Sequence, residues 1–286
     1  MILDLPNPQR AAQWCIAQRA AGRTLGFVPT MGALHDGHLS LLRHAVSHND
    51  ATCVSIFVNP LQFNDTDDFE RYPRDHEFDK KLLQDEGCDM VFSGTLAQFF
   101  PDATREGDIQ TLDAGKFAQG LEGDYRPGHF DGVRTIVEQL FRTAGQCTAY
   151  FGEKDFQQTL VVKDLARTMG YPDIDVRPTV REKDGLAMSS RNVLLSPEDR
   201  VRATCLYKAL RSARQLWQQG ECDADSLREA MHSELAKTVV KIDYAEVRDP
   251  ENWQPESPQG LMERARGLIA VQLGKVRLID NMQLNN

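Results

Sequence analysis

Short apolar segments alternate with longer amphipathic segments through the first 180 residues of the chain. The apolar segments are rich in β-branched and aromatic residues, which favour β-strands. They predict strands at residues 24–28, 52–59, 88–94, 147–153 and 173–180. Strands that are apolar along almost their whole length are typical of a parallel sheet with both faces covered.

The segments between these strands have the length and the spacing of apolar residues expected of α-helices. We predict helices at residues 39–46, 78–87, 132–145 and 155–170, of which three end at a glycine, as helices commonly do. Strands that alternate with helices indicate an α/β fold with a doubly wound parallel sheet, similar to a Rossmann fold. We assign this domain to residues 1–180.

The pattern changes after Val180, which indicates a smaller α+β domain at residues 181–286. A polar loop at 181–192 precedes Ser196 and Pro197, a helix-capping residue and a first-turn proline, so we predict one long helix from here to about Gln219. A second helix is predicted near 225–237. Strands follow at 239–247 and 267–282, and the second of these is predicted to fold into a hairpin at Gly274.

Composition and charge exclude several classes of protein. With 41% hydrophobic and 26% charged residues the chain has the composition of a folded globular protein. No apolar run approaches the roughly 18 residues of a membrane span, and the N-terminal sequence does not resemble an export signal. Residues 181–286 hold 16 basic and 16 acidic side chains, and residues 1–180 hold 17 and 26, so we expect no nucleic-acid partner. Six scattered cysteines without a C-x-x-C pair predict reduced thiols and a cytoplasmic protein.

Two short motifs suggest nucleotide chemistry. His35 and His38 follow the first predicted strand, at the sheet edge where α/β proteins bind ligands, and their spacing places both imidazoles on one side of a helical turn. Two such donors can stabilise a phosphate as it gains charge. Local capping or packing is the alternative for an isolated H-x-G-H. The second motif, residues 188–191, reads Met-Ser-Ser-Arg and combines hydroxyls, backbone amides and a guanidinium, which suit a triphosphate.

Six motifs occur in the order and spacing of the pantothenate synthetases, also called pantoate–β-alanine ligases, which the chain resembles over about 165 residues and beyond. They are PTMGALHDGHLSLL, FVNPLQF, YPR, YRPGHFDGV, YFGEKDFQQ and DGLAMSSRN. The resemblance implies an ATP-dependent ligase that joins (R)-pantoate to β-alanine through a pantoyl adenylate, releasing AMP and pyrophosphate. It further implies ATP with Mg²⁺, and a homodimer; no membrane partner is expected.

The resemblance also implies roles for individual residues. His38, His35 and Lys154 are the expected catalytic residues, with His38 either a proton donor or an electrostatic stabiliser. Pantoate and β-alanine are expected at Gln62, Gln158 and Asn59. The expected ATP-binding residues are Met31, Gly32, Ala33, Leu34, His35, Asp36, Gly37, His38, Gly152, Glu153, Lys154, Asp155, Val180, Met188, Ser189, Ser190 and Arg191.

Some assignments stay open. Lys154 has a structural alternative, a salt bridge to a neighbouring acid, and the metal ligands are unknown, with Asp79 and Asp89 considered but not assigned. We expect two polar loops, at 63–75 and 121–132, as alternative lids over the intermediate, and the sequence does not decide between them. Three rival functions are an aminoacyl-tRNA synthetase fragment, a nucleotidyltransferase for a phosphorylated precursor, and a nucleotide sensor without catalysis. The balanced charge of residues 181–286 and the uncharged amides of the proposed pocket argue against the first two.

Overall fold

The computed structural model describes residues 1–239 and 241–285, and their contacts divide them into two compact units. Unit 1 holds Met1–Ala118, Arg126–Glu153 and Gln157–Pro178. Unit 2 holds Gln119–Tyr125, Lys154–Phe156 and the described residues from Thr179 onward. Unit 2 therefore includes two short segments that interrupt the sequence of unit 1. The predicted domain boundary between residues 180 and 181 stays a prediction.

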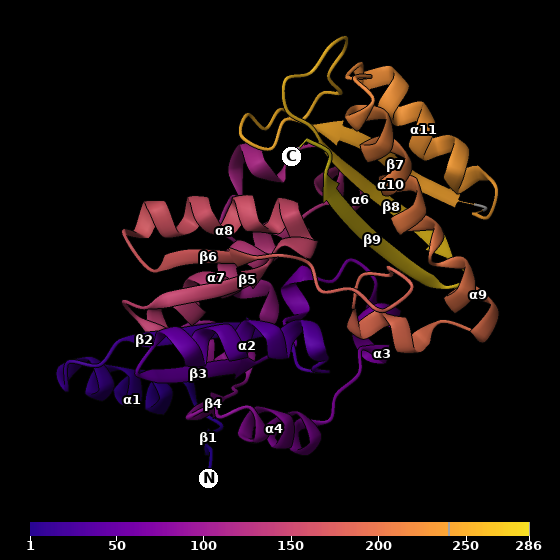
Figure 1. Cartoon of the computed structure of the whole chain (residues 1–286). Helices are drawn as coiled ribbons and strands as arrows, with labels where there is room; N and C mark the ends of the chain where they lie inside the picture. The colour runs from indigo at the N-terminus through magenta and orange to yellow at the C-terminus, as the bar shows by residue number, and fades with distance from the viewer. Residues whose placement is uncertain (240, 286) are drawn as a thin grey trace. The chain divides into compact units, whose positions relative to one another are not determined.

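Unit 1 contains a six-stranded parallel sheet with the order β1-β4-β3-β2-β5-β6 (Figure 1). The strands are β1 (Leu3–Leu5), β2 (Leu25–Thr30), β3 (Ala51–Ile56), β4 (Met90–Phe92), β5 (Thr148–Gly152) and β6 (Asp173–Arg177). The doubly wound α/β prediction is confirmed, as are its five predicted strands. The short edge strand β1 was missed, because three residues give no periodic signal.

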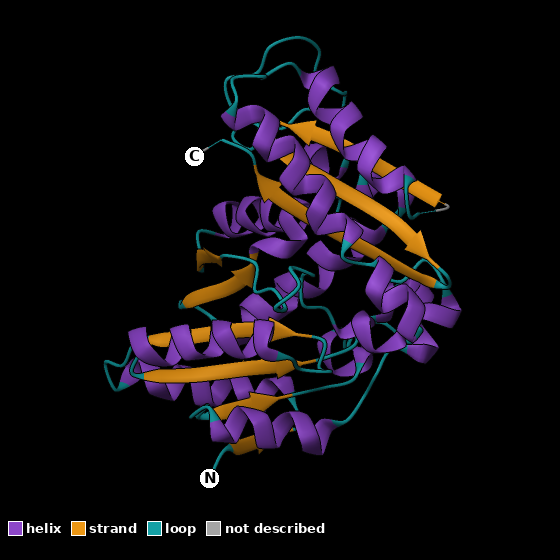
Figure 2. Cartoon of the chain, turned by 45° about the vertical axis from the view of Figure 1, so that its right-hand side comes forward, coloured by secondary structure: helices purple, strands orange, loops and turns teal. Residues whose placement is uncertain are grey.

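Helices cover both faces of this sheet, which makes it the middle layer of three (Figure 2). On one face the core contains residues of α1 (Pro8–Ala20), α7 (His129–Ala144) and α8 (Phe156–Met169). On the other face α2 (Asp36–His48) and α4 (His76–Asp85) pack on the strands. The inner strands β2, β3, β4 and β5 therefore bury side chains on both faces, which explains their apolar runs, whereas the edge strand β6 has no fully buried residue.

Unit 2 is built on an antiparallel sheet of β7 (Lys241–Arg248), β8 (Arg266–Leu273) and β9 (Val276–Gln283). The predicted hairpin is confirmed, with Gly274 at φ 56° in its turn. The helices α10 (Cys205–Gln218) and α11 (Ala224–Ala236) pack on one face of the sheet and form the core of the unit with it. Val240, in the predicted strand 239–247, lies outside the described residues.

The predicted long helix from Ser196 to Gln219 is wrong, because it consists of α9 (Pro197–Arg202) and α10. Its start is as predicted: Ser196 caps the backbone N–H of Asp199, and Pro197 begins the helix. The break lies at Thr204, whose hydroxyl donates to the carbonyl of Val201 over 2.9 Å. A threonine hydroxyl that binds a carbonyl of the preceding turn competes with the backbone ladder, and here the helix restarts one residue later.

Two predicted loops contain regular structure. Residues 63–75 include α3 (Thr66–Arg71), and residues 121–132 include α6 (Glu122–Tyr125) and the first turn of α7. Both segments are rich in charged residues, and some of these charges form ion pairs with residues distant in the sequence. The buried Glu122, for example, pairs with Arg277 of β9 over 2.6 Å. Closure of either segment over a bound intermediate stays a prediction.

All six cysteines are free thiols, five of them buried, as the spacing of the cysteines predicted. In residues 1–239 and 241–285, no helix has the length and apolar character needed to cross a bilayer.

Candidate active site

The two histidines of the H-x-G-H motif lie at the first turn of α2, beyond the carboxyl end of β2. His35 is the N-cap residue and His38 occupies the third helical position, and their ring centroids are 4.1 Å apart. The predicted placement of both imidazoles on one side of the turn is thus confirmed. The local-capping alternative is also partly correct, because each ring takes part in capping.

The capping contacts fix which ring nitrogen carries a proton. Nδ1 of His35 accepts the backbone N–H of Gly37 over 3.2 Å, and Nδ1 of His38 accepts that of His35 over 3.4 Å. An imidazole nitrogen that accepts a hydrogen bond is unprotonated, so the proton of each neutral ring is on Nε2. Both rings are therefore hydrogen-bond donors through Nε2, which is the form that can bind a phosphate oxygen.

A buried carboxylate holds the chain that leads into this turn. Asp79, on α4, has 1% of its surface exposed and accepts the N–H groups of Ala33 and Leu34 over 2.9 and 2.8 Å. Ala33 has φ 50°, a left-handed conformation that costs a non-glycine residue about 1–2 kcal/mol. Burial raises the pKa of the Asp79 carboxyl, although these two N–H groups oppose the rise. Asp79 thus stabilises a strained loop at the entrance to α2.

The pair Asn59 and Gln62 follows β3 in a single 3₁₀ turn, Pro60–Gln62. Asn59 is buried, accepts the N–H of Leu61, and donates to the carbonyl of Gly132 and to the side chain of Gln62, each over 3.1 Å. The amide nitrogen of Gln62 lies 3.1 Å from the sulfur of Met31. The structure therefore brings Gln62 next to the loop of the H-x-G-H motif, and Asn59 orients it.

The backbone carbonyl of Gln62 is also held in place. His129 contacts it through Nδ1 at 2.8 Å, and Arg126 donates to it over 3.2 Å. The side chains of Arg126 and His129 contact each other at 3.1 Å. Gln158, the other predicted pantoate ligand, is half-buried on the first turn of α8, and its contact with pantoate stays a prediction.

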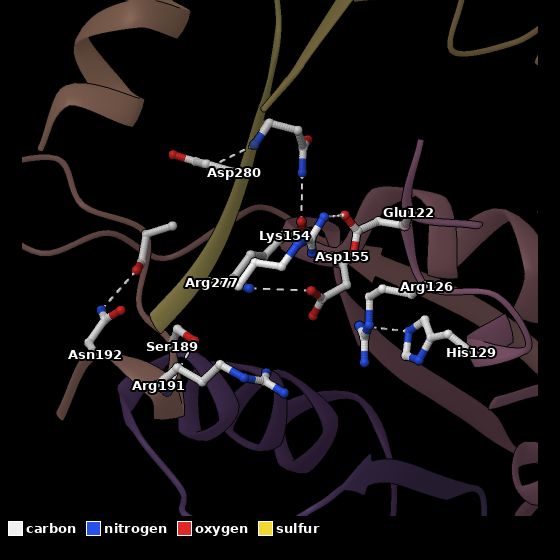
Figure 3. A network of polar contacts seen from close by, with 12 residues as sticks. Glu122, Arg126, His129, Lys154, Asp155, Ser189, Arg191, Asn192, Arg277 and Asp280 are labelled. Atoms are coloured by element: carbon white, nitrogen blue, oxygen red, sulfur yellow. Dashed lines mark hydrogen bonds and ion pairs between the residues drawn. The ribbon is translucent and has the colours of Figure 1, made fainter. Parts of the chain in front are cut away.

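The predicted nucleotide residues after β5 are divided between the two units. Gly152 and Glu153 belong to unit 1, whereas Lys154 and Asp155 belong to unit 2. Lys154 is mostly buried, and its ammonium forms an ion pair with Asp155 at 3.2 Å, so the structural alternative weighed for this lysine is present (Figure 3). A weak pair between adjacent residues is easily exchanged for a stronger anion. The ion pair does not exclude the predicted phosphate contact.

The Met-Ser-Ser-Arg motif follows a short hairpin of unit 2. Arg181 and Ala187 form an antiparallel bridge, and the N–H of Met188 donates to the carbonyl of Val180 over 3.0 Å. Ser189 then caps the 3₁₀ turn Ser190–Leu194, with its hydroxyl oxygen accepting the N–H of Arg191. The predicted loop thus has a defined structure, and Val180 lies beside the motif.

Burial shapes the electrostatics at the base of this hairpin. The carboxylate of Asp280, on β9, is 1% exposed and binds Arg181 through two contacts of 2.6 and 2.9 Å. Burial raises the pKa of Asp280, and the guanidinium of Arg181 opposes the rise. Such a two-point pair fixes both position and angle. The sequence analysis identified neither Asp280 nor the hydrogen bonds by which Asp79 holds the loop at Ala33 and Leu34. The signal available for both was an acidic residue within an apolar pattern.

Metal ligands are not found as a preformed cluster. In the part of the chain that the structure describes, no group of three or more His, Cys, Asp or Glu side chains is arranged to hold a metal ion. The two acids considered from the sequence are engaged with the protein: Asp79 with the loop above, and Asp89 with the backbone and hydroxyl of Thr52 at 2.8 and 3.2 Å. The described residues do not fit a protein-built magnesium site.

Residues 5–283 match the family model described as Pantoate-beta-alanine ligase. A pantothenate synthetase from Thermotoga neapolitana is 46% identical over 92% of both chains, and one from Rubrobacter xylanophilus is 44% identical over 98% of both. The crystal structure of pantothenate synthetase from Thermus thermophilus covers 100% of both chains with 39% identity and a TM-score of 0.89. A Francisella tularensis pantoate-beta-alanine ligase, whose title records a complex with beta-gamma ATP and beta-alanine, has 32% identity and a TM-score of 0.81 over 99% of this chain and 98% of that one.

Proposed function

The chain belongs to the pantoate-beta-alanine ligase family, and from this premise we propose how its residues catalyse the ATP-dependent ligation of (R)-pantoate to β-alanine. The chemistry has two steps. The pantoate carboxylate attacks the α-phosphorus of ATP and forms pantoyl adenylate with release of pyrophosphate. The amine of β-alanine then attacks the acyl carbon and releases AMP. Neither step needs a nucleophile from the protein, so its residues must position the reactants and stabilise charge.

The observation that carries this proposal is the pair of Nε2 donors at the start of α2. His35 and His38 would donate to non-bridging oxygens of the nucleotide as negative charge builds up during attack on the α-phosphorus. Because both rings are fixed by contacts at Nδ1, they would need no reorientation in the transition state. The N-terminus of α2 adds backbone N–H groups and a favourable dipole for the same anion. This arrangement supports a stabilising role for His38 more directly than a proton-donor role.

We assign the rest of the nucleotide to the two predicted segments of unit 2. Lys154 would neutralise phosphate charge, and Asp155 would accept hydrogen bonds from the ribose. The Ser189–Arg191 turn would bind the phosphates through hydroxyl, backbone and guanidinium donors.

Pantoate is assigned to Gln62 and Gln158, whose amides can both donate to and accept from its hydroxyl groups. The contacts of Asn59 support a different role from the direct binding predicted for it. Since its amide is already bonded to Gln62, Gly132 and Leu61, we propose that Asn59 contributes by orienting Gln62.

Three further properties belong to the proposal. Mg²⁺ would accompany ATP and be held by phosphate oxygens and water, because the described side chains form no cluster for it. A homodimer is proposed from family membership, to be tested by gel filtration with light scattering. A cytoplasmic location is proposed from the six free cysteines, since reducing compartments keep thiols unpaired.

The decisive experiment incubates the protein with ATP, Mg²⁺ and (R)-pantoate, with and without β-alanine, and identifies the products by mass spectrometry. We expect pyrophosphate and a bound pantoyl adenylate without β-alanine, and AMP with pantothenate when it is present. A dinucleotide product would identify a nucleotidyltransferase instead. Retention of unchanged ATP in both mixtures would leave a nucleotide sensor, and either result would overturn the proposal.

A further inference from the structure

Strand β9 contains a buried asparagine that contacts several parts of unit 2 at once. Asn281 is 4% exposed and follows Asp280 directly. Its side-chain N–H donates to the backbone carbonyl of Lys154 over 2.7 Å, and its side-chain oxygen accepts from Arg266 over 2.5 Å. The side chain of Asn281 therefore has fixed donor and acceptor ends, and the donor end is used on the residue that we assign to phosphate.

The backbone of the same residue holds the hairpin that precedes the Met-Ser-Ser-Arg motif. The carbonyl of Asn281 accepts from Arg181 over 3.1 Å, and its N–H donates to the carboxylate of Asp280 over 2.8 Å. That carboxylate in turn binds Arg181 at two points. One residue of β9 thus fixes both the Lys154 segment and the base of the hairpin.

A second contact keeps the Lys154 segment against the sheet. The guanidinium of Arg266, on β8, lies 4.3 Å from the ring centre of Phe156, two residues after Lys154, and this ring also lies near Trp253. Arg266 donates to Gln283 over 3.0 Å as well as to Asn281. The carbonyl of Lys154 and the ring of Phe156 are therefore held by neighbouring groups, which leaves the segment little freedom to shift.

We propose that Asn281 is a positioning residue for the adenylation step, because its side-chain N–H sets the place of Lys154 relative to the Ser189–Arg191 turn. This inference rests on the proposed function, in which Lys154 and that turn bind the same nucleotide. Asn281 itself does not contact the substrate in this proposal. It acts through the backbone of Lys154, and a displacement of that backbone by a fraction of an ångström moves the ammonium away from the phosphates.

Asn281→Asp tests the proposal with the smallest possible change. It keeps the shape of the side chain and the acceptor for Arg266, and it replaces the donor to Lys154 with an oxygen that repels the carbonyl. We expect kcat/KM for ATP in pantoyl adenylate formation to fall about tenfold, with KM for β-alanine within about twofold of the wild type. The matched control is Asn285→Asp, because the side-chain oxygen of Asn285 accepts from Ala265 and Gln283 and the substitution keeps that acceptor. The control should change neither parameter.

A double-mutant cycle with Lys154→Ala separates positioning from a general structural role. If Asn281 acts through Lys154, Asn281→Asp should reduce adenylation little or not at all in the Lys154→Ala background. A merely structural role would lower both backgrounds by the same factor, and that additive result would overturn the inference. So would wild-type kinetics of Asn281→Asp. Should Asn281→Asp fail to fold, Asn281→Ser enters the same cycle with the same criteria.

The outcome also separates this inference from the proposed function. If the wild-type protein forms no pantoyl adenylate, the proposed function fails before any variant is compared. If the wild type is active and Lys154→Ala is impaired while Asn281→Asp is unaffected, only the positioning role of Asn281 fails.

Discussion

Asp79 offers the sharpest test of how the H-x-G-H loop is held. Replacing it with alanine leaves the N–H groups of Ala33 and Leu34 without this acceptor. A hydrogen bond to a charged group contributes about 1.5–3 kcal/mol, and an orphaned buried donor costs a similar amount. Since part of the loop can reach water after relaxation, we expect Asp79→Ala to lower the free energy of unfolding by about 2–4 kcal/mol.

The effect on ATP follows from the conformation of Ala33. Its positive φ costs about 1–2 kcal/mol, and the hydrogen bonds to Asp79 offset that cost in the wild type. If the competent loop becomes less favourable by about 1.4–2.8 kcal/mol, its population falls tenfold to a hundredfold, and the apparent KM for ATP rises by the same factor. Steady-state kinetics and urea unfolding measure the two effects independently.

Asp79→Asn distinguishes geometry from charge. Its amide oxygen can accept only one of the two N–H groups well, so the loop should still loosen and KM for ATP should rise. Its effect on stability should be smaller than that of Asp79→Ala, within about 1 kcal/mol, because it also removes a buried charge.

The pH dependence has a definite sign. Burial raises the native pKa of Asp79 above its ordinary value, so the native state binds the proton more tightly than the unfolded state. The ionisation of Asp79 therefore lowers stability as pH rises from about 4 through the raised pKa. The free energy of unfolding of the wild type should therefore fall relative to that of Asp79→Asn as pH rises from about 4 through the raised pKa of Asp79. Above that pKa the difference between the two proteins should stay constant.

The exposed Asp85→Asn on the same helix is the control and should match the wild type in every assay. A wild-type KM for ATP in Asp79→Ala, together with a stability loss below about 0.5 kcal/mol, would show that Asp79 does not hold the loop.

Three further changes test other parts of the structure. His38→Ala should lower the rate of adenylation about 10²-fold or more, with the fold intact and a loss of stability no larger than that of a helix cap, about 0.5–2 kcal/mol. A rate near that of the wild type would remove His38 from the site. Gly132→Ala places a methyl group 2.1 Å from the carbonyl oxygen of Leu61. This clash should displace the turn that carries Gln62 and raise KM for pantoate. The control is Gly107→Ala, because its methyl group meets nothing within 4 Å. Arg200 lowers the pKa of Asp184, so Asp184 should stabilise the protein above about pH 4 and lose this effect below it. Chemical denaturation of Asp184→Asn from about pH 3 to 7 should show a difference of at most about 1 kcal/mol that vanishes at the acid end.

The sequence determined much of this protein by local rules. Apolar runs specified the inner strands of the parallel sheet, because both faces of such strands are buried and no polar alternation interrupts them. Ser196 and Pro197 marked a helix start, and Gly274 marked a hairpin, because these residues act through their own backbone geometry. The H-x-G-H motif could be placed at a helix start for the same reason.

The tertiary structure decided what depends on partners distant in the sequence. Asp79 lies 46 residues from Ala33, and Asn281 lies 127 residues from Lys154, so no periodicity or motif connects either pair. Local pattern also failed at Thr204, where a hydroxyl competes for a carbonyl and divides the predicted helix. The residues proposed to bear the chemistry were predicted from the sequence, because the ligand constrains their types and spacing. The residues that hold them in place were not, because a buried carboxylate or amide is assigned to its partner only when the chain has folded around it.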